Sequence, residues 1–154
     1  MRLGSAGSVH ELIDALPWPA RWNMREFLDA VGRQRGKPIK LYRAELTSLP
    51  CGLLVRTQAA DRIVVAACTT SAHARHIAMH ELGHLLCEHP DSGERGVLGQ
   101  TLFAPRWEKE AERFADLADE RVDAIQSSAD VARLPWTAQQ LHAAFGPGER
   151  RRCA

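Results

Sequence analysis

The chain has 154 residues, of which 45% are hydrophobic and 25% are charged, and this composition fits one globular domain with an apolar core. Twenty basic and nineteen acidic residues give a formal net charge of +1. This balance provides no general electrostatic reason to bind nucleic acid or a membrane surface directly. We expect a single domain over residues 1–146, followed by a disordered basic tail at 147–154.

The sequence also favours a cytoplasmic location. No apolar run approaches the roughly 20 residues that a membrane-spanning helix needs, and the N-terminal segment lacks the apolar stretch of a secretory signal. The four cysteines contain no Cys-x-x-Cys pair. We therefore expect free thiols that mostly fill the core, and no disulfide framework.

Two capped helices are predicted at the start of the chain. Ser8 and Glu11 form a capping box ahead of an amphipathic pattern, which indicates a short helix. Asn23 and Glu26 form a second cap, and the helix that follows should end near Gly36. Both helices carry apolar residues at helical spacing, so each should bury one face.

A small sheet is predicted after residue 38. From there the apolar residues no longer recur at helical spacing and instead alternate with polar ones, as they do in a strand. The segments 39–41, 52–57 and 62–69 alternate or are rich in β-branched residues, and residues 58–61 would join the last two as a hairpin. We expect an antiparallel three-stranded sheet. Since it lies between helices, the fold class is α+β.

Three further helices are predicted in the second half of the chain. The first runs from 71 to about 88, the second from about 106 to 127, and a capped third begins at Thr137. A loop over 90–105 separates the first two. A loop of this length is usually functional or mobile, and this one should lie beside the site described next.

The first of these helices contains the motif His-Glu-x-x-His. On a helix, His80 and His84 project from one face and can hold one zinc ion, while Glu81 can accept a proton from water. A match to this pattern also arises by chance in ordinary helices. Apolar neighbours make this helix a buried one, however, and burying two histidines and a glutamate without a metal would be costly. Gly83 would let a strand or a substrate backbone approach closely.

A catalytic zinc site needs a third protein ligand. The extended metzincin motif would place a glycine at Cys87 and a histidine at Pro90, so this class is excluded. His89 stands one residue short of the required position. Because an α-helix turns about 100° per residue, His89 could not replace that ligand unless the helix unwound locally.

The long second helix offers an acidic third ligand. Glu108, Ala111, Glu112 and Ala115 share one face by their spacing, and the alanines would allow close helix packing. We expect Glu108 to bind zinc and Glu112 to accept a hydrogen bond from the outer nitrogen of a ligand histidine. Glu110 is the alternative ligand. A third possibility is that all three acids belong to a solvated helix face.

The motifs resemble those of the ImmA/IrrE-type zinc metallopeptidases. The resemblance rests on the segment 80–86, His-Glu-Leu-Gly-His-Leu-Leu, and on Glu108-x-x-Ala-x-x-Phe-Ala at 108–115. It implies zincin-type helices around the motif, and a zinc endopeptidase that cleaves a specific protein, commonly a helix-turn-helix transcriptional repressor. Two departures stand out. Glu112 replaces the usual asparagine or aspartate, and the segment 116–120 replaces a Leu-Met-Pro-like sequence.

The expected function is therefore hydrolysis of a peptide bond in a protein partner. Zinc held by His80, His84 and Glu108 would lower the pKa of water toward about 7, and Glu81 would carry the proton to the leaving amine. A non-cleaving zinc-binding interaction module, or a toxin–antitoxin component with the same fold, is the alternative. The unusual segment 116–120 is the feature that supports this alternative.

Overall fold

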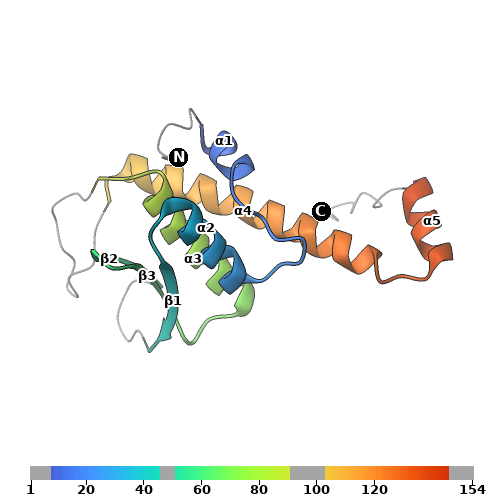
Figure 1. The fold of residues 1–154 in the computed structure, drawn as a ribbon, viewed down its shortest axis with the longest axis horizontal. Coiled ribbons are helices and arrows are strands. Elements are labelled where there is room, and N and C mark those ends of the chain that lie inside the picture. Colours follow the sequence, from blue (N-terminus) through green and yellow to red (C-terminus); the bar gives the residue numbers. More distant parts are fainter. Residues whose placement is uncertain (1–7, 46–50, 91–102, 146–154) are drawn as a thin grey trace, which may run out of the picture.

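The computed structural model describes residues 8–45, 51–90 and 103–145. These residues form five helices and three strands, with the long helix α4 running across the molecule (Figure 1). In chain order the elements are α1 (Val9–Asp14), α2 (Met24–Arg35), β1 (Ile39–Ala44), β2 (Gly52–Arg56), β3 (Asp61–Ala66), α3 (Ser71–Leu86), α4 (Pro105–Val131) and α5 (Trp136–Phe145). The class is α+β, as predicted.

The predicted caps of the first two helices are confirmed. The Ser8 hydroxyl accepts a hydrogen bond from the backbone N–H of Glu11 at 3.3 Å, and the Asn23 side chain accepts one from Glu26 at 3.1 Å. Helix α2 ends at Gly36, whose φ of 74° is the left-handed geometry that glycine adopts without steric cost. Local side-chain chemistry therefore sets these helix boundaries.

The sheet is mixed, so the prediction of an antiparallel sheet is wrong. Its order is β1-β3-β2, with β1 parallel and β2 antiparallel to the central strand β3. The predicted hairpin between β2 and β3 is confirmed, and the backbone N–H of Thr57 donates to the Ala60 carbonyl at 3.2 Å to close it. Strand β3 is the most buried of the three, whereas β1 exposes three of its six side chains. The apolar strand is therefore central, and β1 pairs with it although β2 comes between them in sequence.

Helix α3 lies at the centre of the fold and packs against β2, β3 and α4. A side chain at Gly83 would come within 3.2 Å of Ala111 and Phe114, so this glycine permits close contact with α4. The expected approach of a strand or substrate at Gly83 is therefore wrong. It is Gly52 of β2 whose missing side chain makes room for α3, because an added Cβ would lie 2.9 Å from the Glu81 carboxylate.

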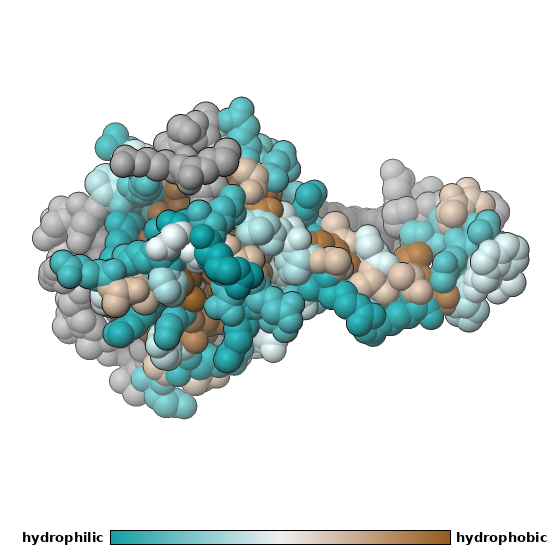
Figure 2. Space-filling view, viewed as in Figure 1, coloured by the Kyte–Doolittle hydropathy of each residue, from teal (hydrophilic) through white to brown (hydrophobic). Residues whose placement is uncertain are grey.

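Helix α4 has two parts with different surroundings. The part as far as residue 122 buries Ala111, Phe114, Ala115, Ala118 and Val122 against the rest of the protein. The remainder of the helix continues past the predicted end at 127 to Val131 and leads to α5 at the far end of an arm (Figure 1). Apolar side chains are exposed along this arm (Figure 2), including Trp136, with 72% of its surface accessible.

Some predictions fall partly outside the described residues. Most of the expected loop at 90–105 and the expected tail at 147–154 lie there. Cys51, Cys68 and Cys87 are free thiols as predicted, although Cys51 and Cys68 are exposed and do not fill the core. Among the helices described, none combines the length and the apolar character needed to cross a membrane.

Candidate metal centre

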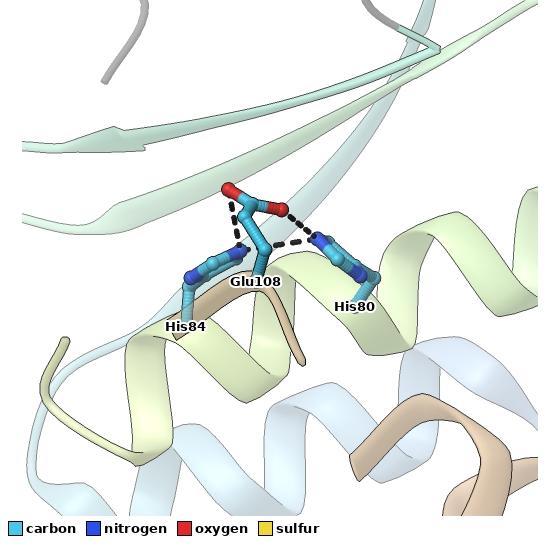
Figure 3. A group of neighbouring side chains, drawn as sticks. All are labelled: His80, His84 and Glu108. Carbon is cyan, nitrogen blue, oxygen red and sulfur yellow. Dashed lines mark hydrogen bonds and ion pairs between the residues drawn. The ribbon is translucent and has the colours of Figure 1, made fainter. Parts of the chain in front are cut away.

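Three of the predicted site residues converge on one point (Figure 3). His80 and His84 project from successive turns of α3, and Glu108 reaches them from the first turns of α4. The Nε2 atoms of the two histidines lie 3.0 Å apart. The Glu108 carboxylate oxygens lie 3.1 Å from His80 Nε2 and 3.6 Å from His84 Nε2.

The spacing of these atoms fits a tetrahedral metal ion. Zinc binds histidine nitrogen and carboxylate oxygen at about 2.0–2.2 Å, so neighbouring ligand atoms in a tetrahedron are about 3.4 Å apart. The two Nε2 atoms are 3.0 Å apart, and each lies 3.1 or 3.6 Å from a different oxygen of the Glu108 carboxylate, so the spacings are close to this value. His84 is buried, whereas the Glu108 side chain is 46% exposed, so the group is open to solvent on one side. Two nitrogens and one oxygen are also a donor set that zinc accepts.

Glu81 lies beside this group, between α3 and the edge strand β2. Its carboxylate faces the Gly52 backbone of β2, where no side chain intervenes. Burial raises the pKa of Glu81 to about 7, and the nearby negative charge of Glu108 adds to the effect. A carboxylate with this pKa exchanges protons readily near neutral pH.

The outer nitrogen of His80 meets Glu112, the residue for which the sequence predicts this contact. His80 Nδ1 lies 3.2 Å from one Glu112 oxygen, and His76 Nε2 lies 3.2 Å from the other. His76 Nδ1 in turn lies 2.8 Å from Asp119. Burial by itself would lower the pKa of His76, but hydrogen bonding to Asp119 and the negative charges of Glu112 and Asp119 outweigh it and raise this pKa.

The outer nitrogen of His84 meets His89, a contact that the sequence does not predict. The two Nδ1 atoms lie 2.9 Å apart, and His89 Nε2 lies 3.0 Å from a Glu110 oxygen. Burial lowers the pKa of His84 to about 3, and the neighbouring guanidinium of Arg56 and imidazoles of His80 and His89 further oppose a positive charge on this ring. Burial also lowers the pKa of His89. Both rings are therefore neutral at physiological pH.

Glu110, the alternative ligand, is not part of the His80, His84 and Glu108 group. It belongs to a second cluster with Cys87 and His89. Burial, together with the charge of Glu110, raises the pKa of Cys87 to about 11. Because zinc binds the thiolate and not the thiol, this second cluster is the poorer metal site.

Aromatic and cationic side chains enclose the two buried histidines. The Phe103 ring stacks on His84 with centroids 3.7 Å apart, and Trp107 stacks on His89 at 4.9 Å. The Arg56 guanidinium donates to the backbone carbonyls of both histidines. Nothing in the local sequence pattern singles out these three residues, because they come from a strand, a loop end and another helix.

Comparison of the chain with protein-family models, with curated proteins and with solved structures finds no match. The resemblance to ImmA/IrrE-type metallopeptidases therefore remains a prediction from the two short motifs. The geometry of the candidate metal centre is independent of that resemblance, because it rests on atoms from α3 and α4.

Proposed function

We propose that the protein is a zinc-dependent metallopeptidase that cleaves a protein partner. The observation that carries the proposal is the convergence of His80, His84 and Glu108 at separations of 3.0–3.6 Å, with Glu81 beside them. A third acidic ligand from a second helix is the arrangement found in thermolysin-like zinc peptidases.

The proposed reaction divides its tasks among a few side chains. Zinc in such a site acts as a Lewis acid toward a carbonyl group and lowers the pKa of water. His80, His84 and Glu108 hold and orient the ion, and His84 does so from a buried position. Glu81 accepts the proton of the attacking water and passes it to the leaving amine. Glu112 orients the His80 ring from its outer nitrogen.

The substrate class follows from the resemblance and not from the geometry. Its two motifs favour a narrow target, such as a helix-turn-helix transcriptional repressor, whose cleavage would alter gene expression. The near-neutral charge of the chain agrees with action through a protein partner and not through direct contact with nucleic acid. We therefore place the protein in a regulatory proteolysis step, with zinc as its cofactor.

Co-expression with a helix-turn-helix protein encoded beside the gene tests this proposal. The wild type should yield a specific cleavage product, and Glu81→Gln should abolish it because the amide cannot accept the proton. Glu120→Gln, an exposed position on α4, is the matched control and should cleave normally. Zinc content and unfolding curves would establish that the Glu81→Gln protein is folded and loaded. A partner left intact by the loaded wild type would contradict the peptidase and favour the non-cleaving zinc module.

A further inference from the structure

Helix α3 ends in a backbone motif that turns His89 back over the last turn of the helix. Cys87 is the C-cap, and Glu88 follows it with a φ of 53°, in the left-handed region. The N–H of His89 donates to the His84 carbonyl at 3.1 Å, and the N–H of Glu88 donates to Leu85 at 3.4 Å. This is the pair of hydrogen bonds of the Schellman motif.

The Schellman motif usually brings two apolar side chains into contact at the positions occupied here by His84 and His89. In this protein both positions hold histidines, and both residues are only 1% exposed. Their rings meet through Nδ1 atoms 2.9 Å apart. Two buried ring nitrogens at this distance need one hydrogen between them, so one must donate and the other accept.

The Glu110 carboxylate decides the direction of that hydrogen bond. An ionised carboxylate only accepts, so the His89 Nε2 that lies 3.0 Å away must carry the hydrogen. A neutral His89 then has a lone pair on Nδ1 and accepts from His84 Nδ1. His84 in turn has its lone pair on Nε2, the atom that faces His80 and Glu108.

The surroundings favour neutral rings throughout this chain of contacts. Arg56 places a guanidinium against the carbonyls of His84 and His89, and a second positive charge in this buried place would be repelled. Phe103 and Trp107 stack on the two rings and hold their planes. A charged His89 would donate from both nitrogens, and His84 would then carry its hydrogen on the metal-facing atom.

We propose that His89 and Glu110 are positioning residues that fix His84 with hydrogen on Nδ1 and a free Nε2 lone pair. His89 acts directly on His84, and Glu110 acts through His89. The effect on zinc binding rests on the proposed function, because the fixed tautomer leaves the His84 Nε2 lone pair free to bind the ion. Partners of this kind typically contribute 10- to 100-fold to metal affinity.

Nitrogen-15 NMR of the histidine rings, recorded on the full chain without metal, tests the tautomer directly. Wild-type His84 should carry its hydrogen on Nδ1. His89→Leu removes the acceptor, so His84 should move toward the tautomer with hydrogen on Nε2. His89→Asn keeps an oxygen near the position of Nδ1 and should restore the wild-type tautomer. His73→Leu, on an exposed part of α3, is the control and should change nothing.

Titration with Zn²⁺ against a chromophoric chelator tests the consequence. Affinity should fall about 10- to 100-fold in His89→Leu and recover in His89→Asn. Glu110→Gln, which keeps an acceptor, should bind zinc more tightly than Glu110→Ala.

A folded His89→Leu protein with wild-type affinity would overturn the inference, and so would a second zinc ion that is lost in Cys87→Ser. A wild type that binds no zinc would overturn the proposed function, whereas a fixed His84 tautomer in that protein would still support the positioning role.

Discussion

His84 and Glu108 show how much of the candidate metal centre depends on single residues. The His-x-x-x-His spacing predicts that His80 and His84 point the same way, because an α-helix fixes that direction. The spacing of Glu108, Ala111 and Glu112 likewise predicts one face of α4, from which Glu108 can reach the histidines. The contact between His89 and His84 was not predictable from the sequence. A helix that ends in this left-handed turn usually has glycine at the turn, and here the position is Glu88.

The absence of a side chain at Gly52 should matter for stability. An added Cβ would lie 2.4 Å from the Ile77 side chain and 2.9 Å from the Glu81 carboxylate, so these side chains or the elements that carry them would have to shift. Gly52→Ala should therefore reduce the free energy of unfolding by about 1–3 kcal/mol. Urea unfolding measures this change. Cys51→Ala, at the exposed neighbouring position, should stay within about 0.5 kcal/mol of the wild type, and equal stability of both variants would refute the close contact.

At the scale of elements, the contact between α3 and α4 organises the centre. Gly83 and Ala111 let the two helices approach, which brings Glu108 to the histidines and Glu112 to His80. The alanines and the acids of α4 share one helical period, so the sequence predicts this pairing, although it does not predict the part played by Gly83. The mixed sheet was not predictable in the same way, because strand order depends on which strand is buried most and not on which strands are consecutive.

The same contact gives a pH dependence through His76. Its pKa is raised in the folded protein, so its ion pairs stabilise the fold below the unfolded pKa of about 6.5 and lose this effect as pH rises through the higher folded value. Asp119, Glu112 and Asp116 face the ring from α4, and Arg75 precedes it on α3.

His76→Gln should therefore cost more stability at pH 5.5 than at pH 8.5, by up to about 1 kcal/mol. Urea unfolding of the variant and the wild type at both pH values measures this difference. His73→Gln, which replaces an exposed histidine on the same helix, should show no such difference. An equal loss at both pH values in His76→Gln would mean that the ion pairs with α4 contribute nothing.

At the scale of the whole molecule, the body that holds the candidate metal centre is distinct from the arm formed by the end of α4 and by α5 (Figure 1). The last buried residue of α4 is Val122, and the arm exposes Leu134, Trp136 and Leu141. Periodicity predicts both helices of the arm, but it does not reveal that they leave the body. The position of the arm depends on tertiary packing, because only the part of α4 as far as Val122 is covered by the rest of the protein.

A chain that ends at Leu134 should therefore keep its metal centre. Removal of α5 takes away exposed side chains, so we expect a change of less than about 0.5 kcal/mol in the free energy of unfolding and unchanged zinc affinity. Urea unfolding and zinc titration of the shortened chain test this. A large loss of stability would mean that α5 supports the body.

The central claim is that His80, His84 and Glu108 together hold one zinc ion. Zinc content measured after exhaustive dialysis, on folded protein, tests it most directly. The wild type should retain one zinc ion per chain, Glu108→Ala should lose it, and the exposed variant Glu120→Ala should retain it. A wild type without zinc, or a Glu108→Ala protein that holds zinc as firmly as the wild type, would contradict the proposed centre.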